Sequence, residues 1–207
     1  MTHTLHRYGT KENLQEDYVF YIRGLKVADC YTQLLKSAEI LHSEKPVNSR
    51  FMIREKNFTD GSKIKDFTKY LKNNRGYACA FSSKEKTKNV LKKLKNADLG
   101  LSVVVSGLID EILKMLKEVG LKPHTANVSL GIHGKKKRLL PKDKILEITT
   151  MCGHALISSK LAEVVFEKVK SGKMSYKEGA ELIAYQCPCG IFNLDRCQEL
   201  FEADKKI

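Results

Sequence analysis

The stretch from residue 99 to residue 107, Leu-Gly-Leu-Ser-Val-Val-Val-Ser-Gly, is the clearest structural signal in this chain. Its run of β-branched residues predicts a buried strand. Ser106 and Gly107 then lead directly into residues 108–119, whose apolar spacing is that of a helix, and Gly120 has the position of a helix C-cap. A strand followed at once by a helix is the unit from which α/β folds are built.

The same alternation extends to both sides of this stretch. Residues 17–23, 77–81 and 124–132 have strand composition, and residues 28–42 and 84–96 have helical spacing. Strands that alternate with helices of this length predict β–α–β units. We therefore expect an α/β fold with a mostly parallel sheet and flanking helices, and we assign residues 1–140 to this domain.

Beyond residue 140 the pattern becomes helical. Residues 143–151 and 154–170 each have an apolar face, and Ser175 with Glu178 matches a capping box at the start of another helix. Asn193 is placed to cap a last helix over residues 194–201. Residues 141–207 are thus predicted to form a helical, cysteine-rich subdomain that binds a metal.

Composition excludes several classes of protein. Of 207 residues, 42% are apolar, which is enough to build a core, so disorder is not expected. The longest apolar run covers residues 101–109 and includes Ser102, Ser106 and Gly107, so it is far shorter than the roughly 20 residues of a membrane-spanning helix. The first residues do not resemble a secretory signal, and we expect a cytoplasmic protein.

The net charge of +13 is concentrated in the first two thirds of the chain. Residues 1–144 carry 29 basic and 15 acidic side chains, with lysine clusters at 84–95 and 135–144. A basic surface attracts nucleic acid, an anionic substrate or an acidic redox partner protein. Lysines without interleaved aromatic residues are equally typical of a solvated surface, so nucleic acid is the weaker of these expectations.

Four of the six cysteines fall at expected helix ends. Cys30 and Cys79 stand alone in apolar segments and are interpreted as core residues. The other four follow the spacing Cys-x34-Cys-x-Cys-x7-Cys, and a reducing compartment argues against disulfides. Helix N-termini and tight turns favour thiolates, so we predict that a metal centre is held by Cys152, Cys187, Cys189 and Cys197.

The kind of metal follows from ligand type and spacing. Thiolate sets suit zinc or iron–sulfur clusters. Because the chain has no Cys-x2-Cys turn, which structural zinc usually takes, we favour a [4Fe–4S] iron–sulfur cluster and keep zinc as the alternative. Without a metal, Cys187 and Cys189 would be a redox-active pair or core residues. His154 is a candidate extra ligand or proton donor, or simply a capping side chain.

Two weaker sites are also suggested. Ser106 and Gly107, between a strand and a helix, are candidates for binding an anion, although neither a dinucleotide fingerprint nor a Walker loop is present and an ordinary turn is favoured. Arg7 and Tyr8 would form a polar pocket if histidines from both ends of the α/β domain gathered around them, but scattered surface histidines are favoured. These histidines are His3, His6, His124 and His133.

These observations lead to one functional hypothesis and two alternatives. The first is a cytoplasmic iron–sulfur protein of anaerobic metabolism, which transfers electrons as part of an oxidoreductase system or assists chemistry on a small anionic substrate. The alternatives are a zinc-stabilised nucleic-acid-binding module and an accessory protein that assembles or delivers a metal or cluster.

Overall fold

The computed structural model describes residues 6–24, 30–49, 76–132 and 139–205. In chain order the elements are α1 (Lys11–Leu14), β1 (Tyr18–Arg23), α2 (Tyr31–Ser43), β2 (Asn48–Ser49), β3 (Gly76–Phe81), α4 (Lys84–Ala97), β4 (Ser102–Ser106), α5 (Ile109–Glu118), α6 (Asp143–Thr149), α7 (Ser159–Lys170), α8 (Tyr176–Ala184) and α9 (Leu194–Lys205).

The four described strands form an antiparallel sheet in the order β2-β3-β1-β4. The prediction of a mostly parallel sheet is therefore wrong. β3 and β4, which α4 connects, both run opposite to β1 and hence in the same direction as each other. The β–α–β pattern is real, but β1 lies between the two strands and pairs with both, and sequence periodicity does not specify this insertion.

The predicted strand over residues 124–132 is also absent from the described structure. This segment has no regular secondary structure, and Val128 and Leu130 are 62% and 80% exposed. Its alternation of apolar and polar residues satisfied the strand pattern locally, but the sheet edge that it was expected to join is not beside it.

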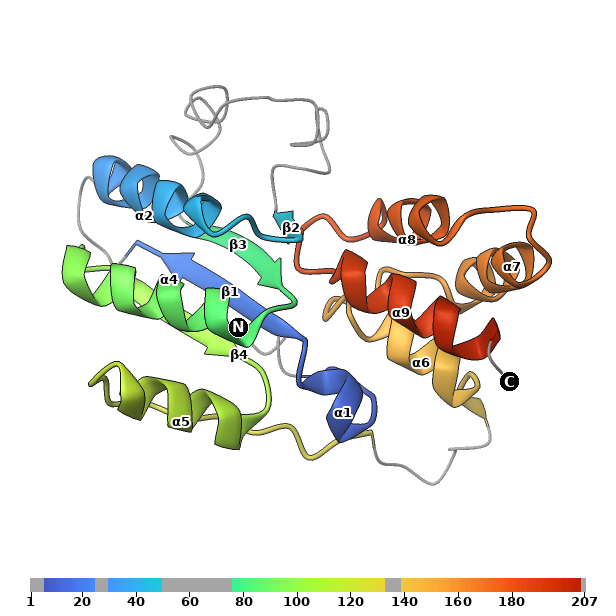
Figure 1. Cartoon of the computed structure of the whole chain (residues 1–207), viewed down its shortest axis with the longest axis horizontal. Helices are drawn as coiled ribbons and strands as arrows, with labels where there is room; N and C mark the ends of the chain where they lie inside the picture. Colours follow the sequence, from blue (N-terminus) through green and yellow to red (C-terminus); the bar gives the residue numbers. More distant parts are fainter. Residues whose placement is uncertain (1–5, 25–29, 50–75, 133–138, 206–207) are drawn as a thin grey trace.

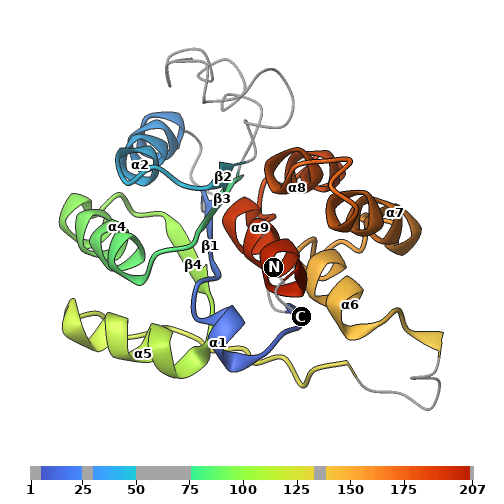
Figure 2. The ribbon, with the colours of Figure 1, turned by 45° about the vertical axis from the view of Figure 1, so that its right-hand side comes forward.

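Helices cover both faces of the sheet (Figures 1 and 2). Alternate residues of β1 point to opposite sides, so Tyr18, Phe20 and Ile22 pack with α2, α4 and α5 in one core. Val19 and Ala78, from the other face, belong to a second core built mainly from α6 to α9. Figure 2 shows the sheet between these two helical layers.

The capping signals at the starts of α8 and α9 are confirmed, but the helix predicted over residues 154–170 begins only at Ser159, because residues 154–158 continue the loop that follows Cys152. Ser175 and Glu178 form the predicted capping box at the start of α8, and Asn193 Oδ1 accepts a hydrogen bond from the Arg196 amide at the start of α9. The first of these helices begins at Asp143, near the expected boundary at residue 140.

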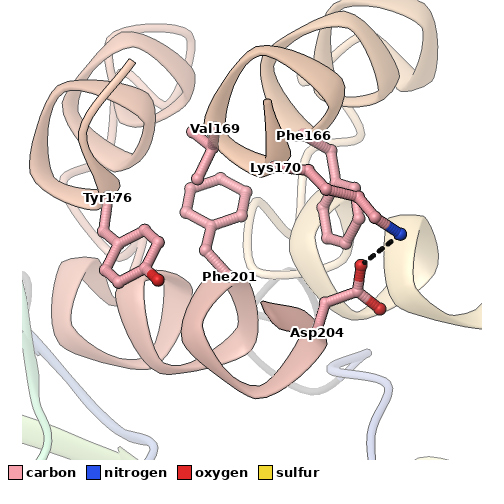
Figure 3. Close-up of a pocket in the computed structure, with 6 residues that line it drawn as sticks. All are labelled: Phe166, Val169, Lys170, Tyr176, Phe201 and Asp204. Atoms are coloured by element: carbon pink, nitrogen blue, oxygen red, sulfur yellow. Dashed lines mark ion pairs between the residues drawn. The ribbon is translucent and has the colours of Figure 1, made fainter. Parts of the chain in front are cut away.

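One hollow opens among these helices (Figure 3). Phe166, Tyr176 and Phe201 line it, and Lys170 pairs with Asp204 at its edge at 3.3 Å. Its volume of about 10 Å³ is that of one water molecule at most, so it is a packing defect and not a ligand site.

Candidate metal centre

Two loops bring three of the four predicted ligands to one place. Cys152 lies in the loop between α6 and α7, and Cys187 and Cys189 lie in the loop between α8 and α9. Cys152 and Cys187 are 1% and 0% exposed, Cys189 is half-buried and His154 is exposed.

The two loops form the same turn. The Ala155 amide donates to the Cys152 carbonyl at 3.0 Å, and the Gly190 amide donates to the Cys187 carbonyl at 3.2 Å. The residue three places after each cysteine is left-handed, with φ of 53° at Ala155 and 65° at Gly190. For Ala155 this conformation is strained, whereas glycine adopts it freely. The matching backbone presents Cys152 and Cys187 at equivalent positions.

Main-chain amides point at both sulfur atoms. Cys152 accepts hydrogen bonds from the amides of His154 and Leu156, and Cys187 accepts one from the amide of Ile191, again at an equivalent position. Such N–H groups stabilise a thiolate and tune thiolate-bound metal centres.

The side chains contact one another in two pairs that join equivalent positions of the turns. The thiols of Cys152 and Cys187 are hydrogen-bonded. Two residues further along each loop, His154 Nδ1 lies 3.2 Å from Cys189 Sγ. The two loops therefore face each other through two contacts, Cys152 with Cys187 and His154 with Cys189.

The interaction between Cys152 and Cys187 shifts the pKa values of the two thiols in opposite directions. The hydrogen bond with Cys187 and the loop amides lower the pKa of Cys152 to about 6, against the opposing effect of burial. The same hydrogen bond, together with burial, raises the pKa of Cys187. The two thiols therefore titrate as one coupled pair, in which the first proton is lost more readily than from an isolated buried cysteine.

A buried cation lies beside these sulfurs. The Arg7 side chain is 8% exposed, donates to the Ile191 carbonyl, and lies 3.0 Å from Asp17. Burial lowers the pKa of Arg7, while Asp17 and the two cysteines counteract this. Within the described residues its Nε has no hydrogen-bond partner. Arg196 contacts the same carboxylate oxygen, Asp17 Oδ2, at 2.8 Å, so two guanidinium groups share one carboxylate.

Cys197 has a different environment. It lies in α9, is 0% exposed and belongs to the apolar core, and burial raises its pKa with Arg196 as the opposing charge. Among the described residues no three or more His, Cys, Asp or Glu side chains are already arranged to hold a metal ion. The four-cysteine ligand set therefore stays a prediction, while the loops associate His154 with Cys152, Cys187 and Cys189.

Sequence patterns did not indicate the charged groups that surround the sulfurs. Asp17 and Arg196 are entirely buried, and Arg7 and Tyr8 contact the helical layer instead of a histidine pocket. Tyr8 donates from its amide to Thr150 and from its hydroxyl to Asp143. His6 and His124 are exposed, and His3 and His133 lie outside the described residues. The one available signal was the position of Arg196, four residues before Leu200 on the apolar face of α9.

The predicted anion site at Ser106 and Gly107 has acidic residues beside it. Ser106 ends β4 and is 7% exposed, Gly107 is exposed, and the first turn of α5 carries Asp110 and Glu111, so an anion there would meet negative charge. The anion site stays a prediction.

The lysines of α4 are largely engaged within the chain. Lys84, Lys88 and Lys93 form ion pairs with Glu111, Glu118 and Glu44, and Lys95 donates to the Val119 carbonyl. In the second cluster, residues 135–138 lie outside the described structure.

Comparisons with protein families, with curated proteins and with solved structures found no match for this chain. In the described part of the chain, every helix is too short or too polar to cross a membrane. We therefore infer a function from the α6–α7 and α8–α9 loops and from the buried charges of Arg7, Asp17 and Arg196 beside them.

Proposed function

We propose that this chain is a metalloprotein in which Cys152, His154, Cys187 and Cys189 bind one metal ion between the two matched loops. The observation that carries the proposal is the repeated turn, which aims main-chain amides at both buried sulfurs. Coordination would require the exposed His154 and the half-buried Cys189 to rotate toward the Cys152–Cys187 pair, because the four side chains are now in two separate contacts.

The ligand set and its spacing favour zinc. Three thiolates and one imidazole are a common structural zinc set. With Zn–S bonds of about 2.3 Å, tetrahedral geometry places two thiolates about 3.8 Å apart, so one ion requires neighbouring sulfurs, and the thiols of Cys152 and Cys187 already interact with each other. A [4Fe–4S] cluster spreads its ligands over a wider cage, so these two loops would have to separate to hold it.

The buried charges also support an anionic centre. Arg7 lies within the field of Cys152 and Cys187, and it shares the Asp17 carboxylate with Arg196. Zn²⁺ with three thiolates and a neutral imidazole carries a net charge of −1, which the Arg7 guanidinium would stabilise. A [4Fe–4S] cluster with the same ligands would carry a similar charge, and for this reason the iron–sulfur cluster is the second candidate.

Burial supports a structural role for the metal over thiol exchange. An exchanging thiolate must be reached by its partner, whereas Cys152 is 1% exposed and Cys187 is 0% exposed. A metal at this point would connect the α6–α7 and α8–α9 loops and, through Arg7 at Ile191, the N-terminal segment. The ion pairs of the α4 lysines reduce the charge available to phosphate, so the structure adds no support for nucleic-acid binding.

The test is metal analysis of protein purified without air and without a metal-binding tag. We expect about one zinc per chain and no acid-labile sulfide. Iron and sulfide in equal amounts, with absorbance near 400 nm, would establish the cluster instead. Protein that folds without zinc or iron would overturn the proposal.

Variants then identify the ligands. His154→Asn and Cys189→Ser should lose bound metal, whereas Cys197→Ala should keep it, and Cys30→Ala is the matched control because Cys30 lies at the start of α2. Cobalt substitution of each folded variant provides a second readout, since the visible spectrum reports how many thiolates bind. Retention of metal by His154→Asn and its loss in Cys197→Ala would favour the ligand set predicted from the sequence.

A further inference from the structure

A cleft of about 470 Å³ lies on the face of the sheet that packs against α2, α4 and α5. The cysteine loops belong to the core on the opposite face. The cleft opens at the edge where β1 begins and β3 ends, close to the N-terminus of α4. Its lining includes Glu16, Tyr18, Ser82, Lys84, Glu85 and Glu111. A volume of this size suits a small organic molecule.

Tyr18 has an unsatisfied hydroxyl in this lining. The residue is 1% exposed, and its O–H finds no hydrogen-bond partner among the described residues. Burial raises the pKa of Tyr18 to about 12, and the charges that add to this effect are Glu111 and Glu16, both from the cleft. The hydroxyl is therefore protonated, and Tyr18 is part of the cleft lining together with these two glutamates. A buried hydroxyl without a partner is costly, so its retention calls for an explanation.

The cleft is acidic, although the whole chain is basic. The lining places Glu16, Glu85 and Glu111 beside one lysine, Lys84, which is already paired with Glu111. Lys114 and Lys11 act on Glu111 from outside the lining. Behind Glu16 lie further carboxyl groups. Burial raises the pKa of Glu199, and the negative charges of Glu16 and Asp195 add to this, as does the hydrogen bond that protonated Glu199 donates to Glu16. Asp195 in turn accepts a hydrogen bond from Ser82 at 2.7 Å. This arrangement attracts cations.

We propose that this cleft binds a small organic cation that carries an ammonium group and a hydroxyl or carbonyl oxygen, as amino sugars and amino alcohols do. The ammonium group donates to Glu16 and Glu85, and the ligand oxygen accepts the hydrogen bond that Tyr18 has no partner for. The proposal is independent of the metal centre, since none of the lining residues belongs to the cysteine loops.

The experiment compares glucosamine with glucose, which differ at one position by an ammonium group in place of a hydroxyl. Binding to the metal-loaded full chain is followed by the amide NMR shifts of residues 15–18 and 82–85. We expect glucosamine to shift these amides and to bind about tenfold more tightly than glucose, with the difference reduced by salt. Equal shifts from both sugars, or shifts confined to other residues, would overturn the proposal.

Three variants complete the test. Tyr18→Phe keeps the buried ring and should weaken glucosamine binding about fivefold, while its Tm should be unchanged or higher because an unsatisfied hydroxyl is removed. Glu16→Gln should weaken binding about tenfold. Glu167→Gln, an exposed position on α7, is the control and should bind as the wild type does. A Tyr18→Phe protein that is folded and binds glucosamine normally would contradict the assignment.

Discussion

Asp17, at the start of β1, and Arg196, in the last helix, form an ion pair at 2.8 Å in which both side chains are fully buried. The same carboxylate lies 3.0 Å from Arg7, and Asn193 donates to Asp17 at 3.2 Å. This group joins the beginning of the sheet to the helical layer that carries the cysteine loops. Because the charges are out of water, the pairing depends on every partner being present.

Asp17→Asn should therefore be strongly destabilising. The substitution keeps the side-chain shape but leaves Arg7 and Arg196 buried without a counter-charge, which should cost about 3–5 kcal/mol in the free energy of unfolding. Urea denaturation measures this value. Lys160→Ala is the control, because its ion pair with Glu163 is 83% and 44% exposed and should contribute less than about 1 kcal/mol. Equal effects of the two substitutions would show that the Asp17 group is not a buried electrostatic centre.

The matched turns predict effects of different size for two substitutions. Gly190→Ala places a side chain at φ 65° and should destabilise the protein by about 1–2 kcal/mol. Ala155→Gly relieves strain at φ 53° but adds chain entropy, so its effect should lie within about 1 kcal/mol of zero. Thermal denaturation of both variants provides the comparison. A Gly190→Ala protein as stable as the wild type would mean that the second loop does not keep this turn.

Metal removal should loosen a defined part of the molecule. If the two loops hold an ion, a chelator that removes it should increase amide hydrogen exchange in residues 150–158 and 185–193, because the ion stabilises only the folded state. Amides of β3 and α4, which pack in the other core, should keep their protection. Uniform loss of protection, or no change in the loops after complete removal of metal, would argue against a centre at this place.

The sequence predicted local features of this fold better than the pairing of its strands. Ser175 caps α8 as predicted, through bonds within four residues that are encoded locally. Ser83 and Ser158 cap α4 and α7 in the same way, although they were not singled out from the sequence. The order of the sheet depends on β1 entering between β3 and β4, which is a choice among distant partners. Segment 124–132 shows the same limit, since its alternation had no neighbouring strand to satisfy it.

The candidate site was predictable to a similar extent. Cys152, Cys187 and Cys189 could be identified because they lie at helix ends, where turns expose sulfur to main-chain amides. Cys197 shares the spacing pattern, but one further turn into α9 places it in the apolar core. The pairing of His154 with Cys189 and the approach of Arg7 join residues 35 and 184 positions apart, and no local pattern specifies these contacts.

His42 should make the stability of the α2 layer depend on pH. Burial lowers the pKa of His42 to about 4, and its Nε2 contacts the Tyr77 hydroxyl. In the unfolded chain the pKa of histidine is about 6.5, so as the pH falls the unfolded state takes up this proton first. The stabilisation is therefore complete above about pH 6.5 and is lost progressively between about pH 6.5 and 4, by about 3 kcal/mol at most.

The measurement is the free energy of unfolding at pH 7, 5.5 and 4.5 for the wild type and for His42→Gln. Other groups, including the cysteine loops, also titrate in this range, so the quantity that tests His42 is the difference between the two proteins. We expect the advantage of the wild type at pH 7 to shrink as the pH falls, because glutamine cannot take up the proton. A difference that stays constant from pH 7 to 4.5 would mean that His42 is not held neutral by the fold.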